Sequence, residues 1–316
     1  MADYIAFDTS NYTTSAAVLK NGVLYSERRL LPVPHGEKGL RQSDAVFLHT
    51  KALHEITGTL MKRCGKIDIA AVGYSDRPRD TDGSYMPCFL VGEDAALTLA
   101  AVLGVPAYRF SHQAGHISAG LYSCGNDAAF GERFLFFHVS GGTTEGLSVK
   151  RSDCGFDTEI ICRTADISAG QLIDRIGVML GTGFPAGAEL ERMAEGFSGE
   201  VCRRLNIRPT IKDGAVNLSG FENSAKSAMD AGVSPEEIAY ATLKFTAETL
   251  GSALEHAYSV CGKLPVLFAG GVMRNEYIKS VLAGEKVFFA AREFSNDNAA
   301  GTVLLTRRRH EISEKE

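Results

Sequence analysis

Tryptophan is missing from this 316-residue sequence, and neither sign of charge is in large excess. Lysine and arginine number 33 against 38 aspartates and glutamates, and the formal net charge of −5 argues against a globally basic nucleic-acid coat. A local basic patch such as Arg307-Arg308-Arg309 remains compatible with that balance. We expect the charged tail over 307–316 to be a solvated helix end, with His310 at the surface.

Long apolar runs and paired cysteine motifs are also lacking. No segment approaches 18 consecutive apolar residues, so we expect no membrane span. The seven cysteines are odd in number and show no Cys-x-x-Cys spacing, which favours reduced thiols in a cytoplasmic protein. The N-terminus has neither a basic leader nor an apolar segment with a cleavage site, and this favours the same location.

The remaining composition is that of a folded protein. Hydrophobic residues make up 45% and charged residues 22%, and the length favours two domains. The start is typical of a β-meander, in which Asn21-Gly22 is a strong signal for a two-residue hairpin turn. The strands of this meander are expected over 4–8, 13–19 and 23–30.

Helical and strand patterns alternate after the meander. Apolar residues recur with helical spacing over 45–64, and Phe47 lies on the expected apolar side of this helix. A buried strand is expected over 67–73 and an Ala/Leu-rich helix over 89–103. This alternation predicts an α/β fold.

One stretch of the meander is repeated later in the chain. Residues 7–18 read FDTSNYTTSAAV and residues 137–149 read FHVSGGTTEGLSV, so that Ser10 corresponds to Ser140, 130 residues further on. Each copy is an apolar strand, a tight polar turn and a second strand. The repeat indicates two similar domains, although any two β-hairpins share some of this pattern. Hairpin turns of this kind present backbone N–H groups that suit phosphate oxygens.

Two histidines have the spacing of a metal half-site. His112 and His116 lie four residues apart in SHQAGH, so on a helix both imidazoles share one face and reach one ion. Two surface or capping histidines would give the same spacing. Gln113 stands where a zincin metallopeptidase has its general-base glutamate, and an amide cannot abstract a proton.

Glycine-rich segments follow at three places. The sequence VSGGTT at 139–144 follows an apolar strand, and its glycines allow close approach of a ligand. Gly270 and Gly271 directly follow a strand over 265–268, and strand, Gly-Gly and helix in this order are a mononucleotide-binding geometry. The segment 181–187 lies between two helices. Each of these also reads as an ordinary turn, and Asp297, before the last helix, reads as an N-cap.

In this order, the segments resemble the threonylcarbamoyl-transferring tRNA-modification family, long labelled O-sialoglycoprotein endopeptidase or glycoprotease, over nearly the whole chain. The matching stretches are FDTSNYTTSAAV, SHQAGH, VSGGTTE, DISAGQLIDRIGVMLGTGFPAGAELERMA, NLSGF, AGGVMRN and NDNAAG. The resemblance implies the duplicated actin/hexokinase/Hsp70-like ATPase fold, with two lobes around a central cleft. We expect an N-terminal lobe over 1–126, completed by a C-terminal helix over 296–316, and a C-terminal lobe over 127–295.

The resemblance also implies residue roles. One divalent metal ion, Fe or Zn, would be held by His112, His116 and Asp297. Together with the Gly-Gly geometry above, it predicts the nucleotide- and substrate-binding residues Val139, Ser140, Gly141, Gly142, Thr143, Asp174, Gly187, Gly270, Gly271 and Asn275, of which Ser140 and Thr143 are also candidates for catalysis. In the family, threonylcarbamoyl-AMP from a separate synthase is attacked by the exocyclic amine of the tRNA adenosine beside the anticodon, and AMP leaves.

Several positions depart from the family pattern. Tyr12 and Thr13 replace an acidic pair, Thr143 replaces a histidine, and Glu222 replaces a lysine. The loop over 75–83 replaces a Gly-Pro-Gly segment. The nucleotide and metal positions are kept, whereas positions on the acceptor side are not. This pattern indicates a divergent paralogue.

Three functions compete on these observations. The first is a metal- and adenine-nucleotide-dependent threonylcarbamoyltransferase acting on tRNA. The second is a catalytically quiet nucleotide-binding partner or scaffold, pairing with a family paralogue or with itself through the N-terminal lobe. A metallopeptidase is the third and is disfavoured by Gln113.

The arginines of the replaced loop have two interpretations. Arg77 and Arg79 could hold a phosphate with paired hydrogen bonds. Asp76, Asp80 and Asp82 could instead neutralise them locally, and we favour this second interpretation.

Overall fold

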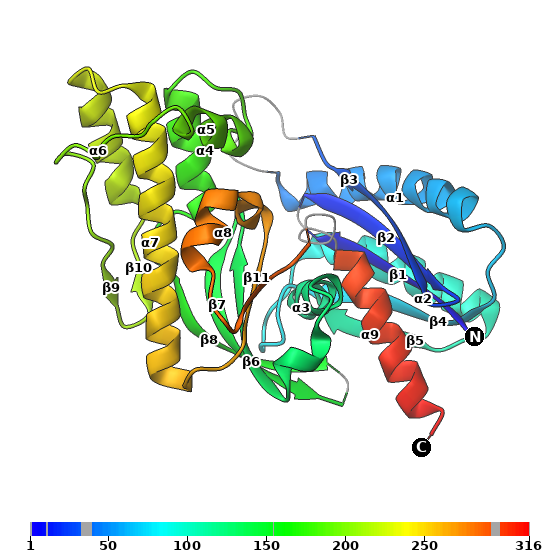
Figure 1. The fold of residues 1–316 in the computed structure, drawn as a ribbon. Coiled ribbons are helices and arrows are strands. Elements are labelled where there is room, and N and C mark those ends of the chain that lie inside the picture. Colours follow the sequence, from blue (N-terminus) through cyan, green and yellow to red (C-terminus); the bar gives the residue numbers. More distant parts are fainter. Residues whose placement is uncertain (1, 11, 33–39, 154, 292–297, 316) are drawn as a thin grey trace. The chain divides into compact units, whose positions relative to one another are not determined.

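The computed structural model describes residues 2–10, 12–32, 40–153, 155–291 and 298–315. The chain forms two compact units, each assembled from separate stretches of sequence (Figure 1). Unit 1 comprises Met1–Gly125, Arg151–Asp157 and Glu293–Glu316, and unit 2 comprises Asn126–Lys150 and Thr158–Arg292. Among the described helices, none has the length and apolar character needed to cross a membrane.

Unit 1 is built on a five-stranded sheet of order β3-β2-β1-β4-β5. β1 pairs antiparallel with β2 and parallel with β4, so it lies at the centre of the sheet. The β2–β3 turn carries positive φ at both Asn21 and Gly22, as the hairpin signal predicts. The strands are β1 (Asp3–Ser10), β2 (Thr13–Lys20), β3 (Val23–Leu30), β4 (Ile69–Arg77) and β5 (Ala107–Ser111).

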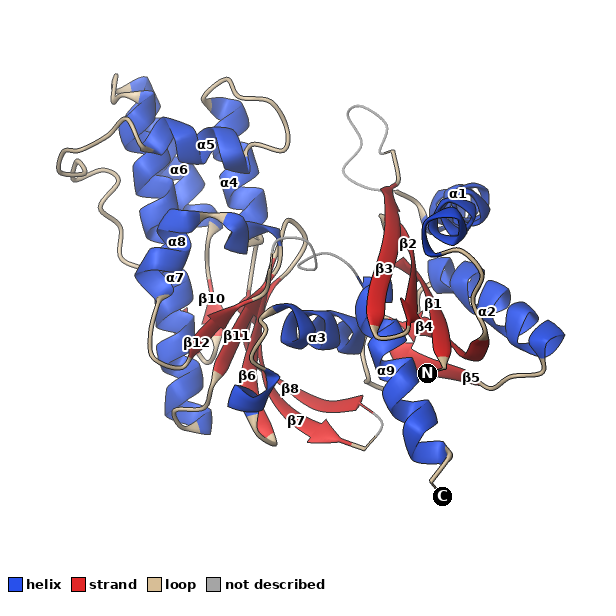
Figure 2. Ribbon diagram, turned by 45° about the vertical axis from the view of Figure 1, so that its right-hand side comes forward, coloured by secondary structure: helices blue, strands red, loops and turns tan. Residues whose placement is uncertain are grey.

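Helices cover both faces of this sheet (Figure 2). Side chains of β1 alternate between the faces: Ile5 and Phe7 pack with α1 and α2, while Tyr4 and Ala6 pack with α9. α3 packs against α9. These helices are α1 (Gln42–Cys64), α2 (Leu90–Leu103) after the short 3-10 helix η1 (Pro87–Phe89), α3 (His112–Ser123) and α9 (Asn298–Ser313).

Unit 2 is built on a seven-stranded sheet of order β12-β11-β6-β7-β8-β10-β9. One face of this sheet is buried in a core to which helices α4 to α8 also contribute. The strand residues in this core include Leu135, Phe137, Val266 and Phe268. The strands are β6 (Arg133–Val139), β7 (Thr144–Ser152), β8 (Gly155–Thr164), β9 (Ile211–Lys212), β10 (Ala215–Val216), β11 (Val266–Ala269) and β12 (Val287–Phe289). The helices are η2 (Asp127–Phe130), α4 (Ala169–Met179), α5 (Gly187–Ala194), α6 (Ser219–Asp230), α7 (Pro235–Cys261), η3 (Gly271–Arg274) and α8 (Glu276–Leu282).

The two sheets share one plan. The order β3-β2-β1-β4-β5 of unit 1 reappears as β8-β7-β6-β11-β12 in unit 2. The central hairpins also share their register. Thr9 pairs with Thr14 in the first and Val139 with Thr144 in the second, and both residues of the second pair lie 130 positions after those of the first. The repeat predicted from the sequence is therefore confirmed as a duplication of the sheet.

Two side chains lie elsewhere than the sequence predicted. Phe47 is 61% exposed, because it lies about 120° around α1 from the buried stripe that contains Leu53. His310 is half-buried rather than a surface residue: its ring packs against Tyr4 and Tyr108, with ring centroids 5.7 and 6.2 Å away. The helix that carries it is held down by the sheet beneath, so a charged sequence did not mean a solvated end.

Candidate functional site

The two histidines lie at the start of α3. Ser111 ends β5 and caps the helix, its Oγ accepting a hydrogen bond from the Ala114 N–H. His112 and His116 follow on one face, and their ring centroids are 4.5 Å apart. Phe89 lies edge-on to the His112 ring at 6.0 Å. The spacing therefore brings the two imidazoles together, as the sequence predicted.

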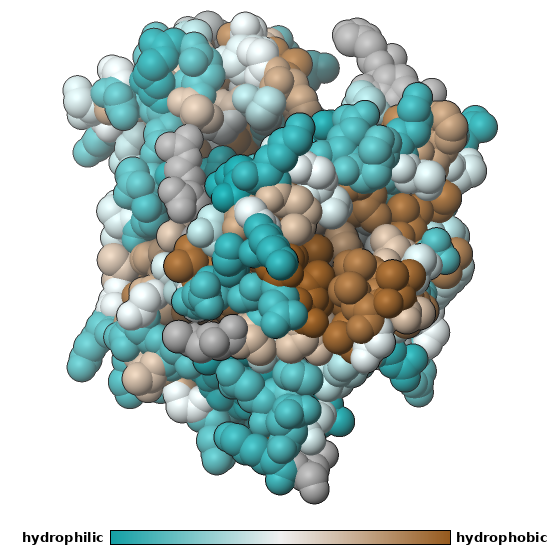
Figure 3. Space-filling model, turned by 90° about the vertical axis from the view of Figure 1, so that its right-hand side faces the viewer, coloured by the Kyte–Doolittle hydropathy of each residue, from teal (hydrophilic) through white to brown (hydrophobic). Residues whose placement is uncertain are grey.

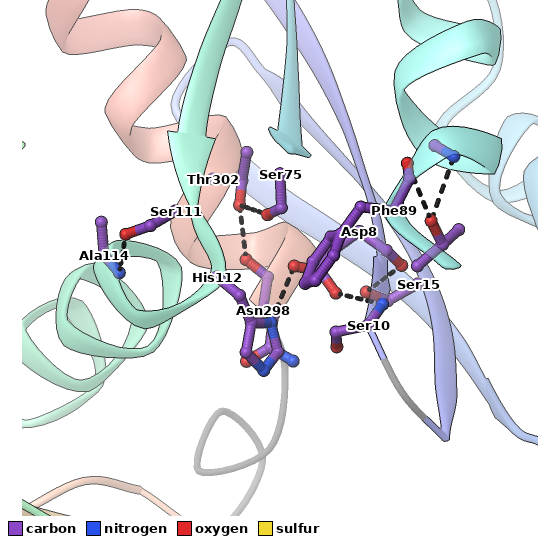
Figure 4. Close-up of polar contacts among 12 residues, drawn as sticks. Asp8, Ser10, Ser15, Ser75, Phe89, Ser111, His112, Ala114, Asn298 and Thr302 are labelled. Atoms are coloured by element: carbon purple, nitrogen blue, oxygen red, sulfur yellow. Dashed lines mark hydrogen bonds and ion pairs between the residues drawn. The ribbon is translucent and has the colours of Figure 1, made fainter. Parts of the chain in front are cut away.

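A buried carboxylate contacts the first histidine (Figure 4). Asp8 of β1 is fully buried, and its Oδ2 lies 2.9 Å from His112 Nδ1. Its Oδ1 accepts a hydrogen bond from the Ser10 N–H at 3.1 Å. Burial alone would raise the pKa of Asp8, but the charge of His112 and hydrogen bonds from His112, Ser75 and Ser10 outweigh it and lower the pKa. Asp8 is therefore held as an ionised hydrogen-bond acceptor.

Two glycines fix the helix crossing behind the histidines. A Cβ on Gly301 of α9 would lie 1.8 Å from the Gly115 carbonyl oxygen, so only glycine allows this approach. Gly115, between the two histidines, contacts the Asn298 backbone in turn. The Asn298 side chain is buried, and within the described part of the chain its Oδ1 has no hydrogen-bond donor. Asp297 lies outside the described residues.

The donors present are suited to a transition metal. With Nδ1 of His112 engaged by Asp8, its Nε2 is the nitrogen left to face an ion, and imidazole nitrogens bind Zn or Fe. The buried Asn298 oxygen lies on the same helix crossing. Among the described residues, no set of three or more His, Cys, Asp or Glu side chains forms a metal cluster, and the predicted third ligand, Asp297, is not one of them.

In unit 2 the turn between β6 and β7 closes on itself. The Ser140 N–H donates to the Thr143 carbonyl, and Ser140 Oγ accepts from the N–H groups of Gly142 and Thr143. Several amides of the turn are thus used internally, contrary to the simple expectation of a phosphate cradle. Gly141 and Gly142 are exposed, and a Cβ on either would meet nothing within 4 Å.

Two neighbouring segments, one at the start of α4 and one directly after β11, pack closely against the β6–β7 turn. Ser168 Oγ donates to the Gly141 carbonyl at 2.8 Å, and a Cβ on Gly170 would lie 2.6 Å from Gly141 Cα. Gly270, with φ +108, approaches Val139 so closely that a Cβ would lie 2.2 Å from its carbonyl oxygen. Gly271 begins η3 at the same place. The turn is therefore rigidly seated, with its glycines open.

Asp174 and its neighbours lie on the adjoining helices. The Ala186 N–H donates to Asp174 Oδ1 at 2.8 Å, which ties the carboxylate to the start of α5 at Gly187. Burial raises the pKa of Asp174, and that single hydrogen bond offsets only part of the effect. Asn275 caps α8 through the Ile278 N–H, and the Glu276 N–H donates to Glu191 of α5. The predicted nucleotide residues thus occupy four adjacent segments.

Comparison with known proteins identifies the family. The model of the family described as tRNA N6-adenosine threonylcarbamoyltransferase (TsaD) matches residues 38–302. The chain belongs to this family. Relatives of that name include one from Methanopyrus kandleri, 26% identical over 85% of this chain and 76% of its own, and one from Nitrosospira multiformis, 29% identical over 79% and 73%. A Thermoplasma acidophilum relative, 27% identical, is named a probable bifunctional tRNA threonylcarbamoyladenosine biosynthesis protein; the match covers 82% of this chain but 47% of that protein.

Solved structures agree on the fold. Component A of (R)-2-hydroxyglutaryl-CoA dehydratase from Acidaminococcus fermentans matches with a TM-score of 0.59 at 12% identity, over 98% of this chain and all of its own. A ROK family glucokinase from Streptomyces griseus, in complex with glucose and AMPPNP, matches at 0.52 and 15% identity, over 97% and 100%. These similarities confirm the predicted actin/hexokinase-type ATPase fold. The threonylcarbamoyltransferase family is an acyltransferase-type enzyme family, as expected.

Two of the positions that depart from the threonylcarbamoyltransferase pattern form ion pairs with residues nearby. Glu222, which replaces a lysine, accepts from Arg175 at 3.0 Å. In the replaced loop, Arg77 forms ion pairs with both Asp76 and Asp80. The local neutralisation that we favoured for Arg77 is therefore confirmed, and its guanidinium is engaged within the loop.

Sequence reasoning missed Asp8. The motif FDTS was used for the repeat, while the aspartate within it was left without a role. A signal was available, because an aspartate inside an apolar central strand must be paired or hydrogen-bonded when it is buried. Its partner, 104 residues away, could not be read from local spacing.

Proposed function

We propose that this chain is a metal- and adenine-nucleotide-dependent threonylcarbamoyltransferase. It would transfer the threonylcarbamoyl group from threonylcarbamoyl-AMP to N6 of the tRNA adenosine beside the anticodon. The observation that carries the proposal is the pairing of His112 and His116 at the start of α3, with Asp8 holding the first ring. Family membership supports the same reaction.

In this proposal the two units have different tasks. His112, His116 and Asp297 would hold one divalent ion, which supplies a Lewis acid for the mixed anhydride. The glycines of the β6–β7 turn would allow the substrate to approach the backbone closely, since a Cβ on either would meet nothing within 4 Å. Ser140 and Thr143 would contribute polar side chains beside the substrate. Asp174 and Asn275 would orient the adenosine. The expected lobes, 1–126 with 296–316 and 127–295, and the expected cleft stay predictions, as does the cytoplasmic location.

The test is a reconstituted transfer. The purified chain is incubated with tRNA, threonine, bicarbonate, ATP and a threonylcarbamoyl-AMP synthase, and the tRNA nucleosides are analysed by mass spectrometry. We expect a threonylcarbamoyl adduct that requires the chain and one equivalent of bound metal. His112→Ala should remove both, whereas His54→Ala, on the exposed side of α1, should remove neither. A metal-loaded chain that forms no adduct contradicts the proposal.

An apolar surface of unit 1 supports a second candidate, in which the chain acts as a catalytically quiet partner. Leu90, Leu97, Val102 and Leu103 of α2 are each at least 45% exposed, and Figure 3 shows apolar side chains gathered on this face of unit 1. Continuous apolar surface marks an interaction site. In a two-fold symmetric dimer the same patch of each copy meets its counterpart, so an apolar patch can be buried by its own copy, and we propose a second copy of the chain as the occupant.

Light scattering after size-exclusion chromatography tests this candidate. We expect a dimer that Leu97→Glu converts to a monomer, whereas Val260→Glu, at a 58% exposed valine of unit 2, leaves the dimer intact. A monomer that associates only when another family member is added would show the paralogue to be the partner. A monomer with full transfer activity contradicts the candidate.

A further inference from the structure

Asp8 binds neither the ion nor the substrate in the function proposed above, but it contacts the ring of a proposed metal ligand. Its carboxylate is completely buried, and Oδ2 is directed at His112 Nδ1 at 2.9 Å (Figure 4). We propose that Asp8 is a positioning residue, which keeps the proton of His112 on Nδ1 so that Nε2 retains its lone pair for a divalent cation. This inference rests on the proposed function, because the cation is the one that the transferase would use.

The neighbouring contacts of Asp8 favour one direction for the hydrogen bond. Its Oδ1 already accepts from the Ser10 N–H, and we infer that Oδ2 likewise accepts, from a hydrogen on His112 Nδ1 at 2.9 Å. The other carboxylate oxygen is occupied by the Ser10 N–H, which stops the group from rotating away. Asp8 also lies in β1, the central strand of its sheet, which is paired with β2 on one side and β4 on the other.

The histidine ring is held from other sides as well. Phe89, itself buried, packs edge-on at 6.0 Å, and the ring of His116 lies at 4.5 Å and 70°. The Ser111 cap fixes the backbone of the first turn of α3. These contacts hold the orientation of the ring before any ion binds, and carboxylate–histidine pairs of this kind raise the basicity of the ligating nitrogen.

The competing interpretation is a purely structural ion pair. The same strand offers a matched comparison, because Asp3 is also a buried aspartate of β1 that accepts two backbone hydrogen bonds, from Asn21 and Asp68. Asp3 contributes to the fold in the same way as Asp8 but is tied to backbone amides. If Asp8 were merely structural, replacing either aspartate would cost stability and leave metal affinity alone.

The experiment compares Asp8→Asn, Asp3→Asn and the parent in the full chain. Zinc affinity is measured by competition with a chromophoric chelator, and the tautomer of His112 in the metal-free protein by 15N NMR. We expect the parent to show the proton on Nδ1, and Asp8→Asn to lose zinc affinity by about ten- to a hundredfold. Asp3→Asn should keep the parent affinity even if its melting temperature falls.

Two results would overturn the inference: a proton on Nε2 in the parent, or a zinc affinity for Asp8→Asn within about twofold of the parent. If Asp8→Asn does not fold, the parent tautomer still decides. A parent that binds no zinc removes the cation and overturns the inference together with the metal part of the proposed function. A parent that behaves as expected here but modifies no tRNA contradicts the proposed function alone.

Discussion

The β1–β2 and β6–β7 hairpins hold equivalent places in two similar sheets, yet they carry different chemistry. In the first, Asp8 is buried and directed at a histidine of another helix. At the corresponding place in the second stands His138, and the turn that follows is an exposed pair of glycines. The duplication thus repeats the backbone, while the side chains at the ends of the strands assign an imidazole site to one unit and an open turn to the other.

Asp8 of unit 1 and Asp174 of unit 2 differ in the direction of their pKa shifts. Asp8 has enough hydrogen bonds and positive charge around it for its pKa to be lowered despite complete burial. Asp174 has the Ala186 amide as its hydrogen-bond donor, and burial keeps its pKa raised. A carboxylate held in the fold at a net electrostatic cost is typical of a group retained for a ligand. Of these two carboxylates, Asp8 is therefore the one satisfied within the fold, and Asp174 is the one left with capacity for a further contact.

The largest expected effect is on stability and comes from disrupting the packing of Gly170 against the β6–β7 turn. Gly170→Ala would place a Cβ 2.6 Å from Gly141 Cα and 2.7 Å from the Ser140 carbonyl, so backbone must move. We expect a loss of about 2–3 kcal/mol in the free energy of unfolding, measured by urea denaturation. Gly220→Ala is the matched control, since it is also the second residue of a helix but has open space around it. Equal stability of the two variants would contradict the close packing of Gly170 against the turn.

The glycines of the turn itself should respond in the opposite way. A Cβ on Gly142 meets nothing within 4 Å, so Gly142→Ala should unfold at the parent urea concentration. If substrate approaches the turn closely, the added methyl should weaken binding of adenine nucleotide by about tenfold, or about 1.4 kcal/mol, in calorimetric titration. Gly58→Ala, in equally open space on α1, should leave nucleotide affinity unchanged and raise stability slightly, because alanine favours a helix interior over glycine. Unchanged nucleotide affinity in Gly142→Ala would remove this turn from the binding site.

Asp174→Asn should separate ligand binding from stability. Because the pKa of Asp174 is raised, its ionised form is less favourable folded than unfolded; this cost is present above the raised pKa and disappears as the pH falls below the ordinary value. The asparagine can still accept from Ala186, so at pH 7 the variant should be at least as stable as the parent while nucleotide affinity falls. Urea unfolding at pH 7 and calorimetry measure the two effects.

Asp166→Asn should change stability at pH 7 in the opposite direction to Asp174→Asn. Burial raises the pKa of Asp166, but hydrogen bonds from the Ser219 hydroxyl and from the Leu218, Ser219 and Ile167 amides outweigh it and lower the pKa. Its stabilisation is present above the ordinary carboxyl pKa and is lost as the pH falls through the lowered one. Asp166→Asn should therefore lose stability at pH 7. The same loss in Asp174→Asn would show that Asp174 is a structural carboxylate.

Local sequence was sufficient where one element determines the outcome. The hairpin turn at Asn21-Gly22 and the shared face of His112 and His116 follow from backbone conformation and helical period, and both are confirmed. The partners of Asp8 and His310 come from distant strands and helices, so no local pattern contains them. Phe47 was assigned to the apolar side of α1 because it is apolar, although the helical period places it about 120° from Leu53, outside the buried stripe.

The smallest expected effect concerns the charge reversal in the family pattern. Glu222 pairs with Arg175 at 3.0 Å, and both side chains are more than one-third exposed, so the pair contributes less than about 1 kcal/mol. Restoring the family residue with Glu222→Lys sets two positive charges against each other and should lower stability by about 0.5 kcal/mol. Adding Arg175→Glu should recover that loss, because the pair is then re-formed in reverse. If the double variant is no more stable than Glu222→Lys in urea unfolding, Arg175 does not compensate the reversal, and the departure at position 222 must be explained by a ligand.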